Sequence, residues 1–116
     1  VGIAYQASIL AFRADEPGSC ATENLPDGDG CQFQDAHIAA GINQAVAAGA
    51  DVVNLSLGGG AAGPATVRAV RAAAAAGTIV VVAAGNGGDG SEEGIDPNQP
   101  DPFAAALLQA GGGHVI

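Results

Sequence analysis

The sequence is poor in basic residues, poor in aromatic residues and free of long hydrophobic runs. It has three Arg and no Lys against 12 acidic residues, a formal net charge of −9. Because Lys and Arg hold phosphate groups, this balance excludes a typical nucleic-acid binder and disfavours an anionic membrane surface. The longest apolar run, residues 78–84, is far shorter than the ~20 residues of a membrane span. Trp and Met are absent, so Val, Ile, Leu and Ala must form the core.

Cysteine is also scarce, with only Cys20 and Cys31 in the chain. A zinc site of the usual kind needs a second pair of ligands, and the sequence has no second pair of cysteines to supply them. A disulfide between them would constrain a loop rich in Gly and Pro, and it would imply an oxidising compartment. Two free thiols in a cytosolic protein are the alternative.

The acidic residues are concentrated in two loops, at about residues 14–35 and 87–102, which hold 11 of the 12. The stretches between the loops are rich in Ala, Val, Ile and Gly, and the length suits one domain. Both ends of the chain lie in apolar sequence, so we expect residues 1–116 to be a single partial domain.

Carboxylates at 89–101 could bind Ca²⁺, although a solvated acidic loop is the default. The stretch Asp27–Gly30 resembles a calcium loop but lacks the Glu that an EF-hand would place near Ile38.

Hydrophobic periodicity predicts strands alternating with helices. We expect strands at 8–12, 51–57, 78–83 and 114–116, and helices at 35–49, 64–77 and 103–109. This order predicts an α/β fold with a parallel sheet and right-handed βαβ crossovers. The unbroken β-branched run at 79–82 predicts a strand covered on both faces. Function in such sheets lies beyond the carboxyl ends of the strands, which here are residues 56–59 and 83–86.

Several isolated motifs have plain structural readings. Gly58, Gly60 and Gly63 form a G-x-G-x-x-G between a strand and a helix, but no acidic residue ends the next strand to hold a ribose. Dinucleotide binding is therefore a weak alternative. His37 and His114 have no acidic neighbour in the sequence that would orient them, and we interpret both as structural.

Asn86 is a stronger candidate for chemistry. It follows a buried strand and is flanked by Gly85 and Gly87. A planar amide at a rigid strand end can aim two N–H donors at developing negative charge, which a carboxylate could not do.

Two motifs about 30 residues apart carry a family resemblance. Residues 54–59 read N-x-S-L-G-G, and residues 80–88 read V-V-V-A-A-G-N-x-G. With residues 2–9 and 38–46, they make nearly the whole chain resemble the middle of a subtilisin-like serine peptidase. The resemblance implies a segment of a doubly wound, three-layer domain that acts on polypeptide substrates. The long acidic insertion and the C-terminal part are similar to those of bacterial cell-surface or autotransporter subtilases, which implies a secreted or cell-surface location.

The resemblance also implies roles for individual residues. Ser56, Leu57, Gly58 and Gly59 would form one wall of the substrate cleft and pair with the peptide backbone. Ala83, Ala84 and Gly85 would line the opposite side of the S1 pocket. Asn86 would be the oxyanion-hole donor.

The triad motifs of that family are missing from this chain. Neither His is followed by Gly-Thr, and no Gly-Thr-Ser is present. We therefore expect the chain to be inactive alone and to self-associate through an exposed sheet edge. A non-catalytic α/β binding module remains an alternative to the peptidase hypothesis.

Overall fold

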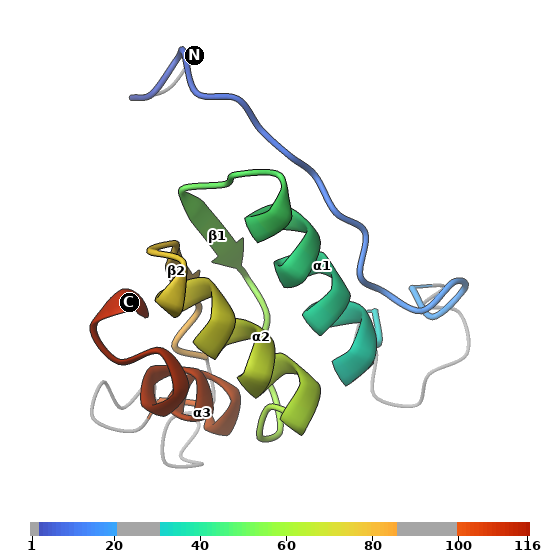
Figure 1. Ribbon diagram of the computed structural model, residues 1–116. Helices are drawn as coiled ribbons and strands as arrows, with labels where there is room; N and C mark the ends of the chain where they lie inside the picture. The colour runs from blue at the N-terminus through green and yellow to red at the C-terminus, as the bar shows by residue number, and fades with distance from the viewer. Residues whose placement is uncertain (1–2, 21–30, 86–99) are drawn as a thin grey trace.

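The computed structural model describes residues 3–20, 31–85 and 100–116 of the chain. These residues contain three α-helices and a two-stranded parallel sheet, so the predicted α/β class is confirmed (Figure 1). None of the described helices is long and apolar enough to cross a membrane. The elements in chain order are α1 (Asp35–Ala47), β1 (Val52–Leu55), α2 (Pro64–Ala75), β2 (Ile79–Val82), α3 (Pro102–Gly111) and the 3₁₀ turn η2 (Gly112–His114).

The two strands pair in register from end to end. Val52 lies beside Ile79 and Leu55 lies beside Val82, with α2 as the crossover connection. The predicted last strand is reduced to a parallel bridge between Val115 and Val80. Its residue Ile116 donates to the Val80 carbonyl and accepts from the Val82 N–H, each at 2.9 Å. The end of the chain thus continues the sheet on the side of β2 away from β1.

The hydrophobic core lies on one face of this sheet. Val53, Leu55 and Val80 are buried, whereas their neighbours Val52 and Ile79 are 53% and 41% exposed. Among the described residues, all three α-helices contribute to the core on the first face and none covers the second, contrary to the prediction of a strand covered on both faces. A β-branched run reports strand propensity, but it does not report which face has a partner. The helical side chains of this core include Ile38, Ile42, Ala69, Val70, Phe103 and Leu107.

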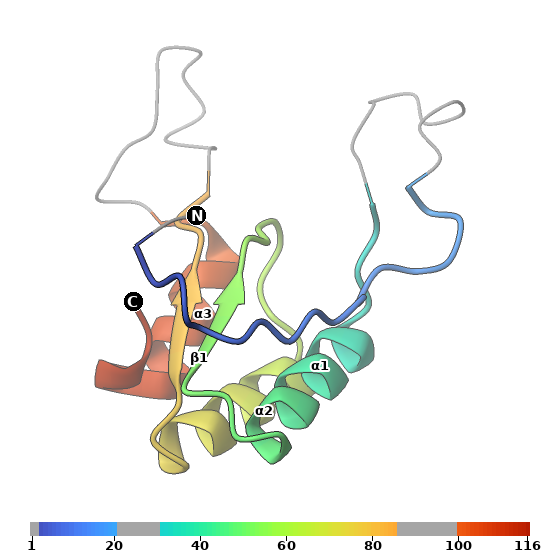
Figure 2. The same cartoon turned by 90° about the horizontal axis from the view of Figure 1, so that it is seen from above.

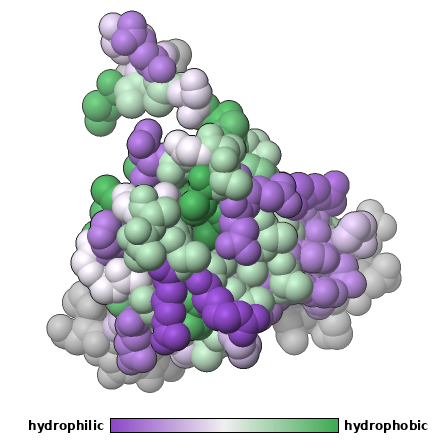
Figure 3. All heavy atoms as spheres, viewed as in Figure 1, coloured by the Kyte–Doolittle hydropathy of each residue, from purple (hydrophilic) through white to green (hydrophobic). Residues whose placement is uncertain are grey.

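The first predicted strand, Ser8–Phe12, is wrong. The segment has no strand structure, and Ile9 and Leu10 are 88% and 51% exposed. It runs across the view in Figure 2, and Figure 3 shows hydrophobic atoms on the N-terminal segment. An open groove of about 1040 Å³ lies between this segment, α1 and β1. An apolar run indicates a strand locally, but pairing also requires a partner edge in register, which is a tertiary property.

The ends of α1 and α2 follow the sequence signals. Gly49 and Gly77 follow the two helices with φ angles of +80° and +86°, a conformation that glycine adopts without strain. Pro64 opens α2 at the first helical position, where its missing N–H costs nothing.

Asp35 joins α1 to α2. It is the first residue of α1, but its carboxylate accepts from the backbone N–H groups of Ala65 and Thr66 at the start of α2, each at 2.9 Å. The hydroxyl of the buried Thr66 donates to the Asp35 carbonyl at 3.2 Å. A Cβ on Gly63 would collide with the Asp35 carboxylate. The carboxylate of one helix therefore caps the next, and it also places a negative charge at the positive end of the α2 dipole.

The ionisation of Asp35 follows from these contacts. Burial raises its pKa, but the hydrogen bonds from Thr66 and Ala65 and the charge of Arg68 outweigh burial, so the pKa lies below its usual value. Because the folded-state pKa is depressed, the stabilisation is complete above the ordinary carboxyl pKa. It is lost as the pH falls through the folded-state value.

We expect Asp35→Asn to lower the free energy of unfolding by about 1–2 kcal/mol near neutral pH, because the amide can accept only one of the two bonds. The deficit should shrink in acid, where the wild-type carboxylate becomes protonated. Urea denaturation across a pH series would measure both effects, with the exposed Asp51→Asn as the matched control for charge. An equal deficit for both variants at every pH would contradict this role.

Candidate functional site

The two segments expected to form the cleft walls meet at one edge of the sheet. Leu55 pairs with Val82 at the ends of β1 and β2, so residues 56–59 and 83–85 leave the sheet side by side. The Ala83 N–H donates to the Leu55 carbonyl at 3.1 Å, which extends the ladder one residue beyond β2. The structure thus brings together the seven described residues of the two predicted walls, and Asn86 lies outside the described residues.

The surface of these walls is mostly backbone. Leu57 and Gly85 are partly buried, and the exposed positions are Ser56, Gly58, Gly59, Ala83 and Ala84. The Ser56 hydroxyl accepts from the Asn54 side-chain amide at 3.0 Å. Because the exposed side chains are small or absent, main-chain N–H and C=O groups lie near the surface. Such an edge suits an extended peptide that binds through its own backbone.

Asp101 connects the walls, and sequence reasoning missed this role by counting it only as part of an acidic loop. Its carboxylate accepts from the Gly59 N–H at 2.5 Å, and its backbone N–H donates to the Ala84 carbonyl at 2.8 Å. The same carboxylate caps α3 through the Phe103 N–H at 2.7 Å. An Asp directly before a Pro and an apolar helix is a signal that could have identified the cap of α3, but not the bond to Gly59.

The glycine-rich turn before α2 is arranged differently from a phosphate-binding turn. The helix N–H groups that would receive a phosphate belong to Ala65 and Thr66, and both already bond to the Asp35 carboxylate. Asp35 also fills the space beside Gly63, the last glycine of the motif. A pyrophosphate at this position would face a fixed negative charge, so the geometry counts against dinucleotide binding.

The sequence of this chain was found to match one known protein family. The model of the subtilase family matches residues 1–107. The chain belongs to the subtilase family. No curated protein sequence matches it. Membership assigns the segment to a family of serine proteases that act on polypeptide substrates, and it agrees with a parallel α/β core as part of the subtilase fold.

Several residues named from the sequence lie outside the described part of this subtilase chain. Asn86 is one of them, and so are the acidic residues of 21–30 and 86–99. The hypotheses of an oxyanion donor and of Ca²⁺ binding therefore stay predictions. His37 is exposed on α1 and His114 is exposed in η2. Self-association through the sheet also stays a prediction.

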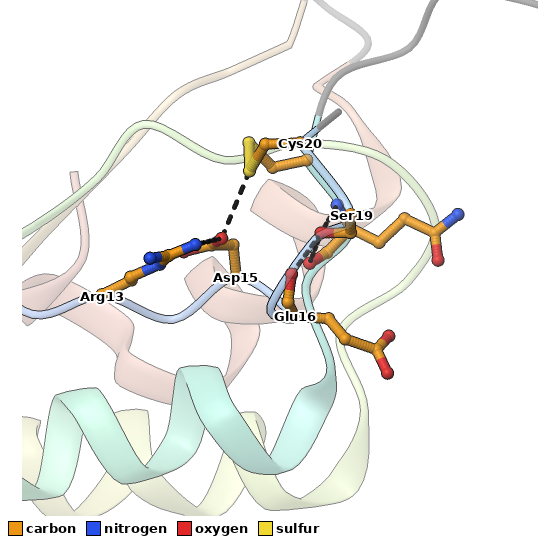
Figure 4. Close-up of polar contacts among 7 residues, drawn as sticks. Arg13, Asp15, Glu16, Ser19 and Cys20 are labelled. Carbon is orange, nitrogen blue, oxygen red and sulfur yellow. Dashed lines mark hydrogen bonds and ion pairs between the residues drawn. A yellow bond between two sulfur atoms is a disulfide. The ribbon is translucent and has the colours of Figure 1, made fainter. Parts of the chain in front are cut away.

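Cys20 and Cys31 form a disulfide at the base of the first acidic loop. Close beside it, Asp15 makes a bridge with Phe33 and accepts from Arg13 Nε and Nη2 at 2.7 and 2.8 Å (Figure 4). Cys20 Sγ lies 3.2 Å from Asp15 Oδ2, a contact without a hydrogen, because a disulfide sulfur carries none. Neither sulfur is a thiolate, so this cluster is not a metal site. Closing the loop stabilises the fold by about 2–3 kcal/mol in the chain-entropy model.

The Arg13 side chain also sets the ionisation of Asp15. Its hydrogen bonds and charge lower the pKa of the Asp15 carboxyl below the usual value, against the opposing effect of desolvation. The Arg13 side chain is 73% exposed, although that of Asp15 is only 10% exposed, so the pair orders the loop base and contributes little to global stability.

Gly85 is the wall residue most sensitive to substitution. Its φ angle is +93°, and an added Cβ would collide with the Asp101 side chain. We expect Gly85→Ala to lower the free energy of unfolding by about 1–3 kcal/mol. Gly60→Ala is the matched control, because Gly60 has open space around it and no positive φ. Denaturation curves that coincide for the two variants would show that the Gly85 backbone is not constrained.

Proposed function

We propose that this chain forms the substrate-binding part of a serine endopeptidase, as the middle of a subtilase catalytic domain. The observation that carries the proposal is the family match over residues 1–107, which includes both walls at the carboxyl edge of the sheet. Ser56–Gly59 would pair with the substrate backbone as an added strand, and Ala83–Gly85 would line the opposite side of the S1 pocket.

Asn86 would supply the oxyanion donor. It follows Gly85 directly, and Gly85 is held by the contact of its wall with Asp101. A side-chain amide at this point would donate N–H groups to the oxygen of the tetrahedral intermediate. The chemistry of the amide and the match to the family motif support the same assignment.

The nucleophile and its base would come from elsewhere in the full-length protein. His37 precedes Ile38 and His114 precedes Val115, so neither is in a His-Gly-Thr motif. We accordingly infer that residues 1–116 alone do not hydrolyse peptides. A secreted or cell-surface location agrees with the disulfide between Cys20 and Cys31, because disulfides persist in oxidising compartments.

A serine-directed fluorophosphonate probe tests the proposal. The full-length product of the gene that encodes this chain should be labelled and should cleave a denatured polypeptide. Residues 1–116 expressed alone should do neither. Labelling of the short chain would contradict its inactivity. Failure of the folded full-length protein to react would favour a binding module in place of a peptidase.

The role of Asn86 has a separate kinetic test in the full-length protein. For the corresponding donor of this family, removal is known to cost about 10²–10³-fold in turnover. We expect Asn86→Ala to lower kcat by that factor with KM nearly unchanged, because the donor acts on the transition state. Gly87→Ala, one position further along the chain, is the control for a substitution that leaves the amide in place. A wild-type kcat in Asn86→Ala would remove Asn86 from the mechanism.

A further inference from the structure

Asp101 touches both cleft walls and the helix behind them. Carboxylate Oδ2 accepts from the Gly59 N–H at 2.5 Å, and the backbone N–H donates to the Ala84 carbonyl at 2.8 Å. Oδ1 accepts from the N–H groups of Phe103 and Ala104 at 2.7 and 3.3 Å. One residue therefore bonds to the loop after β1, the loop after β2 and the first turn of α3.

The two walls lack side chains where they face Asp101. An added Cβ on Gly58 would lie 2.9 Å from Oδ2, and one on Gly85 would collide with the Asp101 side chain. Each wall therefore presents a glycine to the same carboxylate, and the approach of the three segments leaves no room for a methyl group. This fit is independent of the hydrogen bonds and places Asp101 between the walls.

The position of Asp101 is itself fixed by the core. It directly precedes α3, whose Phe103 and Leu107 are 6% and 0% exposed in the main hydrophobic cluster. The carboxylate is thus attached to a packed helix, whereas Gly58 and Gly59 have no side chains and lie between Leu57 and Ala62, which pack against the core. The core holds α3 in place, α3 holds Asp101, and the hydrogen bonds of Asp101 restrain both walls.

We propose that Asp101 is a positioning residue that sets the spacing between the two walls of the substrate cleft. This inference rests on the proposed peptidase function. Asp101 is not a catalytic residue, because its carboxylate oxygens are occupied by backbone N–H groups. Loss of its bond to Gly59 frees the glycine part of the first wall after Leu57, so an incoming peptide must order that part when it binds. The free energy needed to order the wall weakens substrate binding, and the chemical step is unaffected.

Two substitutions separate this role from the capping of α3. Asn and Ser are both good N-caps, so Asp101→Asn and Asp101→Ser keep a bond to the start of α3. Asp101→Asn replaces one carboxylate oxygen with an amide group that cannot accept from Gly59, and the shorter Ser side chain cannot reach it. Ile42→Val on α1 is the matched control, because it loosens the same core at an apolar side chain that takes no part in the hydrogen bonds of Asp101.

Steady-state kinetics of the full-length protein provide the readout. Asp101→Asn and Asp101→Ser should each raise KM for a peptide substrate about tenfold, with kcat within about twofold of wild type. Ile42→Val should lower the melting temperature and leave both constants unchanged. Equal kinetic effects in Asp101→Asn and Ile42→Val would show a merely structural role and overturn the proposal.

Hydrogen exchange tests the bond without using activity. The Gly59 amide should exchange slowly in the wild type and at least about tenfold faster in Asp101→Ser, because its acceptor is lost. Unchanged exchange would refute the link between Asp101 and the first wall. An inactive wild type with the expected exchange would instead refute the proposed peptidase function and, with it, the kinetic consequence.

Discussion

The parallel pairing of β1 with β2 is the constraint on which the rest of the structure depends. Because both strands run in the same direction, their carboxyl ends must appear at one edge, and the register puts Leu55 beside Val82 there. The apolar side chains of both strands bury one face against α1, α2 and α3, which fixes the sheet and leaves its loops at the surface. The two segments that we propose as cleft walls therefore owe their relative position to this pairing.

Two carboxylates connect the starts of packed helices to other segments by hydrogen bonds. Asp35 bonds to the start of α2, and Asp101 bonds to the start of α3, each from outside the regular part of the helix that it caps. Glycines stand where these carboxylates approach other backbone segments closely, as at Gly63 and Gly85. Some of the acidic residues and glycines are therefore explained by contacts of these carboxylates with the backbone. Not all of the acidic residues are solvated charges in loops.

Local sequence signals predicted α1, α2, β1 and β2 because apolar periodicity, Pro64, Gly49 and Gly77 act within a few residues of the chain. The walls were predicted by the motifs that follow the strands. The segment Ser8–Phe12 was mispredicted because strand pairing depends on a distant partner edge. Asp101 escaped notice for the same reason, since Gly59 lies 42 positions away in sequence and only the fold brings them together.

The disulfide and the Asp15–Phe33 bridge close the first acidic loop at its base. The stretch between Cys20 and Cys31 therefore begins and ends at neighbouring positions, because the Cα atoms of the two cysteines are 4.1 Å apart. The entropic cost of a longer loop rises only logarithmically with its length. The number of residues between the two cysteines can therefore change, in evolution or by insertion of an epitope or a binding peptide, while the proposed cleft walls keep their positions.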